Sequence, residues 1–120
     1  MDIIWHGHSF FEIGVKSPND SNQKIKIAID PFDKNIGIYP KRVLADILLI
    51  SHYHYDHSNK DAVKGDYFII DQPGQYEVKN IMIKGVNSFH DNKLGQERGL
   101  NVFYIIQAED IKICHLGDFG

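Results

Sequence analysis

Short apolar runs separated by polar, turn-forming residues make up most of the chain, and this arrangement is typical of β-strands. Residues 24–27 read Lys-Ile-Lys-Ile, which is the period-two alternation expected for a half-exposed strand. Residues 47–50 read Ile-Leu-Leu-Ile, an unbroken apolar run that favours a buried strand. The pattern therefore predicts a β-rich fold.

Turn formers divide the strands into hairpins. Residues 17–22 read Ser-Pro-Asn-Asp-Ser-Asn and separate strands expected at 10–15 and 24–30. The remaining strands are expected at residues 66–71, at 76–86 in two pieces around Lys79 and Asn80, and at 101–107 and 111–114, with a turn at 108–110 between the last two.

Helix signals are confined to residues 59–64, with Asn59 near the start, and to residues 40–44. We therefore expect the α+β fold class with few helices. The large apolar residues of the strands are expected to form one sheet layer with an uncovered face, and such a face usually marks an interface. They are Ile25, Ile27, Ile29, Ile47, Leu49, Phe68, Ile70, Val102, Tyr104 and Ile106.

The motif His-x-His-x-Asp-His occupies residues 52–57, directly after the apolar run. Alternate side chains of an extended chain share a face, so His52, His54 and Asp56 can point together, while His57 requires a turn. Imidazole and carboxylate groups are suitable ligands for zinc and similar divalent metals. Chance would give these four offsets in roughly 1 in 10,000 chains of this size, so the spacing predicts metal binding rather than scattered histidines. The four groups would fill one ion or divide between two.

Composition narrows the setting. The net charge is −3 and the pI about 6.1, so no basic field for nucleic acid is present. Cys114 is the only cysteine, which excludes an internal disulfide and suits a reducing compartment; we expect it to be a buried, inert thiol. The N-terminus has no signal-peptide pattern, and no apolar stretch approaches the roughly 20 residues of a membrane span. These features predict a soluble, cytoplasmic protein that does not bind membranes.

Four further segments, together with the motif, make the chain resemble the metallo-β-lactamase-fold hydrolases. Trp-His-Gly-His-Ser-Phe-Phe at 5–11 resembles the opening of the branch that includes ascorbate-6-phosphate lactonase-like proteins. Ile-Ala-Ile-Asp-Pro-Phe at 27–32 is similar to the strand-ending Asp-Pro of that branch. Ser-Phe-His-Asp at 88–91 and His-Leu-Gly-Asp at 115–118 fall where the family supplies its third histidine and a bridging aspartate.

The resemblance implies a role for each matched residue. Asp30 would orient ligands without binding the metal, His8 receives no assigned role, and His6 and His115 are not expected to be ligands. The implied metal ligands are His52, His54 and His90 for the first ion, Asp56 and His57 for the second, and Asp118 between the two.

The activity implied is that of a metal-dependent hydrolase with one or two zinc ions, or manganese or iron in their place. A metal-bound hydroxide, held and oriented by Asp56, would attack an ester, lactone or phosphoester in a small-molecule substrate.

Members of the family normally continue well past the Gly-Asp segment, with a further histidine for the second metal. Residues 1–120 therefore resemble the N-terminal part of a single domain, the β-rich half of an αββα sandwich. The alternative is a metal-binding half-domain or truncated fragment without catalysis unless a second chain completes it. Self-association or a missing C-terminal segment is expected in either case.

Overall fold

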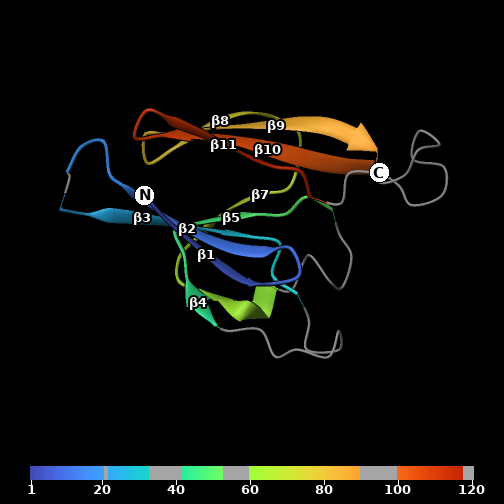
Figure 1. Cartoon of the computed structure of the whole chain (residues 1–120), viewed down its shortest axis with the longest axis horizontal. Coiled ribbons are helices and arrows are strands. Elements are labelled where there is room, and N and C mark those ends of the chain that lie inside the picture. Colours follow the sequence, from blue (N-terminus) through green and yellow to red (C-terminus); the bar gives the residue numbers. More distant parts are fainter. Residues whose placement is uncertain (21, 33–41, 53–59, 90–99, 118–120) are drawn as a thin grey trace.

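The computed structural model describes residues 1–20, 22–32, 42–52, 60–89 and 100–117. Within these residues two β-sheets lie face to face, with β8 to β11 above the sheet that contains β1, β2, β3, β5 and β7 in Figure 1. The five-stranded sheet has the order β1 (Asp2–Gly7), β2 (Phe10–Lys16), β3 (Lys24–Ile29), β5 (Ile47–Leu49), β7 (Phe68–Ile70). The four-stranded sheet has the order β11 (Ile111–His115), β10 (Leu100–Ala108), β9 (Ile81–Phe89), β8 (Gly74–Val78).

The predicted hairpins are confirmed. The strands β2 and β3, β8 and β9, and β10 and β11 pair antiparallel, each with its neighbour in sequence. The tight turns after β8 and β10 have two consecutive residues at positive φ, namely Lys79 and Asn80 (50° and 64°) and Glu109 and Asp110 (53° and 62°). Two positive φ values define the turn type whose twist matches that of the flanking strands.

The apolar run at 47–50 is confirmed as a buried strand. Strand β5 lies between β3 and β7 and runs parallel to both, and all three of its residues are buried. Burial on both faces explains why its sequence is apolar throughout rather than alternating. Because β3 and β5 are parallel neighbours, the residues that follow them, Asp30 and Ser51, lie at the same edge of the sheet.

The main hydrophobic core fills the space between the two sheets, and it shows that one expectation was wrong. The ten apolar residues expected to form one uncovered layer come from both sheets, and nine of them are buried in the structure. Only Phe68 is exposed, at 52%. The inward faces of the two sheets both belong to this chain, so each covers the other.

The outer face of the five-stranded sheet is covered by crossover segments. Two short parallel strands, β4 (Val43–Leu44) and β6 (Val63–Lys64), pack there with the 3-10 helix η2 (Lys60–Ala62). The helix expected at 59–64 is therefore reduced to η2, and the one expected at 40–44 is wrong for Val43 and Leu44, which are in a strand. β-branched Val43 and Val63 favour extended backbone. Residues 40, 41 and 59 lie outside the described residues.

Two further features concern the surface. Cys114 is exposed, so the expectation of a buried thiol is wrong. It lies between the half-buried Ile113 and His115 on β11, and successive strand residues point to opposite faces. In the part of the chain that the structure describes, no helix is long and apolar enough to cross a membrane.

Candidate metal centre

One of the six predicted ligands, His52, lies among the described residues. The other five, His54, Asp56, His57, His90 and Asp118, lie outside them. Among the described residues, no three His, Cys, Asp or Glu side chains come together as a metal site. The structure instead describes the residues from which the ligand-bearing segments start, and these residues form one hydrogen-bonded group.

Asp30 is the fully buried acidic residue of this group. It follows β3 with a φ of 50°, a conformation that aspartate tolerates better than most residues, and its N–H donates to the Leu49 carbonyl at 3.0 Å. Its two carboxylate oxygens accept from Ser51, one from the backbone N–H at 2.7 Å and the other from the hydroxyl at 2.6 Å. Asp30 therefore fixes both the backbone and the side chain of the residue that precedes His52.

Ser51, held by Asp30, in turn contacts the ring of His52. Its single hydroxyl proton is donated to Asp30, so its Oγ faces the His52 Nδ1, 3.0 Å away, as an acceptor. His52 must then carry its proton on Nδ1, which leaves the lone pair on Nε2. A hydrogen bond from one ring nitrogen commonly fixes the tautomer of a metal-binding histidine in this way. The donor set at His52 therefore fits a divalent metal bound through Nε2.

A second part of the group joins the end of β9 to the segment after β11. Asn101, at the start of β10, is fully buried, and its side-chain Nδ2 donates to Ser88 Oγ at 3.0 Å and to the Leu116 carbonyl at 2.8 Å. The Ser88 hydroxyl donates in turn to the Asn101 carbonyl at 3.1 Å. Ser88 and Asn101 are also direct cross-strand partners. Ser88 precedes His90 by two residues, and Leu116 precedes Asp118 by two.

Gly117 brings the two parts together. A Cβ at this position would lie 2.5 Å from Ser51 Cβ and 2.5 Å from Asn101 Oδ1, and the backbone φ of 63° also favours glycine. The backbone of Gly117 therefore packs directly against both Ser51 and Asn101. The Ser51 carbonyl also accepts from the Val102 N–H at 2.8 Å. The segments before His54, His90 and Asp118 thus meet at one place.

The distribution of buried polar residues singles out this place. In the described part of the chain the buried polar residues are Asp30, Ser51, Ser88 and Asn101, and all four belong to the group. Burying polar groups costs free energy unless each is hydrogen-bonded, so they are seldom collected without reason.

His115 borders the same group. Its Nδ1 accepts from the Gly117 N–H at 3.2 Å, and its Nε2 faces the Ser9 carbonyl at 3.2 Å, which together select the neutral ring with its proton on Nε2. Its Nδ1 is also 3.9 Å from an Asp30 oxygen. His115 thus helps to hold the backbone of Gly117 through its Nδ1.

Two other histidines lie near the start of the chain. The Nε2 of His6 pairs with Glu12 Oε2 at 2.9 Å. His8 lies in the turn between β1 and β2 with a φ of 52°, and its carbonyl accepts from the Trp5 indole N–H at 2.9 Å.

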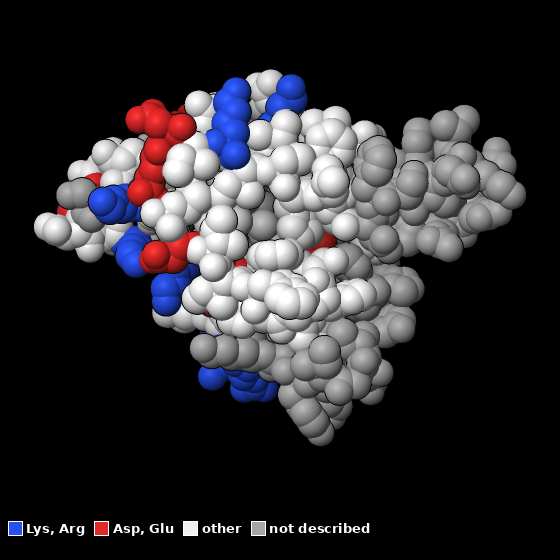
Figure 2. Space-filling model, viewed as in Figure 1, with Lys and Arg blue, Asp and Glu red and all other residues white. Residues whose placement is uncertain are grey.

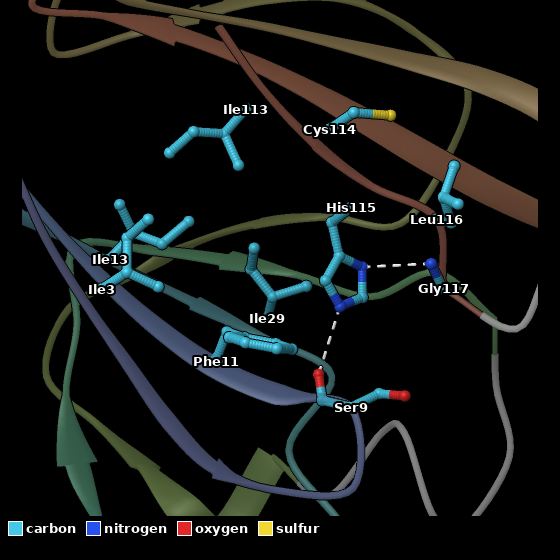
Figure 3. Close-up of a pocket in the computed structure, with 10 residues that line it drawn as sticks. All are labelled: Ile3, Ser9, Phe11, Ile13, Ile29, Ile113, Cys114, His115, Leu116 and Gly117. Carbon is cyan, nitrogen blue, oxygen red and sulfur yellow. Dashed lines mark hydrogen bonds between the residues drawn. The ribbon is translucent and has the colours of Figure 1, made fainter. Parts of the chain in front are cut away.

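A mostly apolar cavity of about 410 Å³ adjoins the group, between strands β1 to β3 and β11. Figure 3 shows the His115 ring in its wall, between the Ser9 carbonyl and the Gly117 amide. The volume is within the range of small-molecule sites. The residues that line it are Ile3, Ser9, Phe11, Ile13, Ile29, Ile113, Cys114, His115, Leu116 and Gly117.

Sequence reasoning gave no role to Ser51, Ser88 or Asn101. Ser51 could have been noticed, because a hydroxyl directly before a ligand histidine is well placed to bond its ring. Asn101 and Ser88 carry no comparable signal. Their pairing depends on the register of β9 and β10, which composition and spacing do not specify.

A family model described as a "Beta-lactamase superfamily domain" matches residues 2–120. The chain belongs to the β-lactamase superfamily. Curated relatives include UPF0173 metal-dependent hydrolases of Methanopyrus kandleri and Thermoplasma volcanium. They are 26% and 29% identical, over the whole of this chain and over 63% and 61% of their own lengths.

A solved structure of the metallo-β-lactamase superfamily shares the fold of this β-lactamase superfamily chain. It is a Thermotoga maritima protein described as a candidate Zn-dependent hydrolase, with a TM-score of 0.70 and 38% sequence identity. The match covers 98% of this chain and 50% of that one. The chain therefore spans about 60% of the length of the two curated relatives and half that of the Thermotoga protein.

Proposed function

We propose that this chain is the metal-binding part of a metal-dependent hydrolase. The enzyme would act on an ester, lactone or phosphoester bond. The observation that carries the proposal is the Asp30–Ser51–His52 series, which holds His52 in the tautomer suited to a metal. Its relatives in Methanopyrus kandleri and Thermoplasma volcanium are named metal-dependent hydrolases, which agrees with this chemistry.

We assign the first ion to His52, His54 and His90, and the second to Asp56, His57 and Asp118, with Asp118 shared. The meeting of Ser51, Ser88 and Gly117 supports this assignment, because the predicted ligands follow these residues by one to six positions. Ser88 and Gly117 precede His90 and Asp118 by two residues and by one, which is why we propose that these two ligands serve the same centre.

A bound zinc ion, or manganese or iron, would supply an activated water and polarise the substrate oxygen. Asp30 and Ser51 would hold His52 in orientation, and Asp56 would orient the attacking water. The apolar wall of the cavity beside Gly117 offers a surface for the non-reacting part of a small-molecule substrate. We place the lactonase-like branch ahead of the other hydrolases because of the opening motif at 5–11, and we propose a cytoplasmic location because Cys114 is the only cysteine.

Metal content tests the proposal. The purified chain should contain between one and two equivalents of metal by elemental analysis, or take it up on titration with zinc. His52→Ala should remove first-site metal, because the site would keep only two of its three histidines and bind weakly. The matched control is His6→Ala, which removes a histidine paired with Glu12 rather than with the buried group and should leave metal content unchanged.

The proposal would be overturned if the purified chain contained no metal and also took up none on titration with zinc. Metal uptake without turnover of ester, lactone or phosphodiester probes would instead favour the alternative, a metal-binding module that requires further polypeptide for catalysis. We also propose that the chain self-associates, and sedimentation of the same sample tests this.

A further inference from the structure

Asn101 is the residue through which the two later ligand-bearing segments contact each other. One side-chain nitrogen donates to Ser88 on β9 and to the Leu116 carbonyl after β11. The orientation of the amide follows from its partners, because a carbonyl oxygen can only accept and the atom that faces it must be the nitrogen. Both hydrogens of the amide group are thus available for two different segments.

The surroundings of Asn101 leave little room for adjustment. The side chain is fully buried, and its Oδ1 lies against the backbone of Gly117. On the same side Gly117 also contacts Ser51, the residue before His52. A shift of Asn101 would therefore move Leu116 and Gly117 relative to both Ser88 and Ser51.

We propose that Asn101 is a positioning residue for the metal centre, which sets the separation between the segment that leads to His90 and the segment that leads to Asp118. This role rests on the metal centre proposed above. It requires two N–H donors on one short side chain, which among the residues of that size asparagine alone supplies. The role differs from ordinary stabilisation because it predicts an effect on metal affinity beyond any effect on folding.

Asn101→Asp tests the role most directly. Aspartate has the same shape but no N–H, and it would place a negatively charged oxygen against the Leu116 carbonyl. Zinc affinity, measured by titration against a competing chelator, should fall by about 10- to 100-fold, the usual cost of losing a group that orients metal ligands. The thermal midpoint of the metal-free chain is measured on the same sample.

The control variant is Ile106→Val, on the same strand and also fully buried, but facing the core between the sheets. It should lower the thermal midpoint and leave zinc affinity unchanged. Should Asn101→Asp fail to fold, Ser88→Ala decides the question. That variant keeps the bond from Asn101 to Leu116, and severalfold weaker zinc binding is expected.

The outcomes separate the two proposals. A folded Asn101→Asp, or Ser88→Ala, that binds zinc as tightly as the unaltered chain overturns the positioning role and leaves the metal centre standing. If zinc affinity fell as much in Ile106→Val as in Asn101→Asp, the affinity would depend on the stability of the fold alone. That result would also overturn the positioning role of Asn101. An unaltered chain that takes up no zinc overturns the metal centre and the positioning role together.

Discussion

The two ends of the β-sandwich hold their polar residues by different means. At the end where β3 and β5 finish and β10 begins, Asp30, Ser51, Ser88 and Asn101 are buried, and they are hydrogen-bonded in two pairs, Asp30 with Ser51 and Ser88 with Asn101. At the other end, exposed charges form pairs across strands and turns. These are Lys24 with Asp2, Lys79 with Asp46 at 2.8 Å, and the N-terminal amine with Glu109 at 3.1 Å.

Figure 2 shows acidic and basic side chains mingled at this second end, on the left of the view. Surface pairs of this kind contribute little to stability, because water solvates the charges in the unfolded chain as well. Buried hydrogen bonds are costly to break, because the partner left behind has no water to replace the lost contact. The contrast indicates that the buried end is the part of the fold most sensitive to substitution. Substitutions there should lower the free energy of unfolding more than substitutions at the charged end.

The largest effect is expected for Asp30→Ala. Two donors of Ser51 would each lose a charged acceptor, and at roughly 1.5–3 kcal/mol for each bond the free energy of unfolding should fall by about 3–6 kcal/mol. Urea unfolding of the metal-free chain measures this. The control is Asp46→Ala at the other end, which should cost no more than about 1 kcal/mol. Equal losses from the two variants would contradict the proposed difference between the ends.

The contrast between the ends also explains what the sequence could predict. Alternation and turn residues predicted the strands and hairpins, because these depend on local order. The same local reasoning placed Asp30 at a strand end and His52 directly after a buried strand, and both positions are confirmed. The helix expected at 40–44 and the buried thiol expected at Cys114 were wrong, although the alternation of β11 itself points that thiol outward.

The contacts that assemble the buried end are long-range in sequence, and local patterns do not specify them. Gly117 meets Ser51, which lies 66 positions earlier in the chain, and Asn101 reaches Leu116, 15 positions later. The division of the apolar residues between two facing sheets was missed for the same reason. A single strand pattern shows that one face is apolar without showing which sheet it belongs to.

Ser51→Ala is expected to lower stability by an intermediate amount and to change the tautomer of His52. In the metal-free chain, nitrogen NMR shifts should place the His52 proton on Nδ1, because Ser51 Oγ accepts it. Without the hydroxyl this preference should disappear, and stability should fall by about 1–3 kcal/mol as Asp30 loses a donor.

Ser51→Thr keeps the hydroxyl and is the control, and it should keep the Nδ1 proton. An Nδ1 proton that persists in Ser51→Ala would show that some other group fixes the His52 ring, and the link from Asp30 to His52 would be wrong.

The smallest effect is expected at Asp46, at the charged end. Partial burial opposes ionisation of Asp46, but hydrogen bonds from Lys79 and from the Lys26 N–H outweigh it and hold the pKa of this carboxyl below its ordinary value. A lowered folded-state pKa stabilises the fold above the pKa of the unfolded group, about 3.9. That stabilisation is lost as the pH falls through the folded value. Asp46→Asn should therefore cost less than about 1 kcal/mol at pH 7, since both side chains of the pair are partly exposed.

The difference in unfolding free energy between Asp46→Asn and the unaltered chain should shrink as the pH is lowered below about 4. Lys79→Met, which removes the other partner, should show the same narrowing. Urea unfolding at pH 7, 5 and 3 measures both variants. A difference that widens in acid would mean that the Asp46 carboxyl is stabilised in its protonated form, contrary to the hydrogen bonds it accepts. A loss at pH 7 as large as that of Asp30→Ala would remove the distinction between the charged end and the buried one.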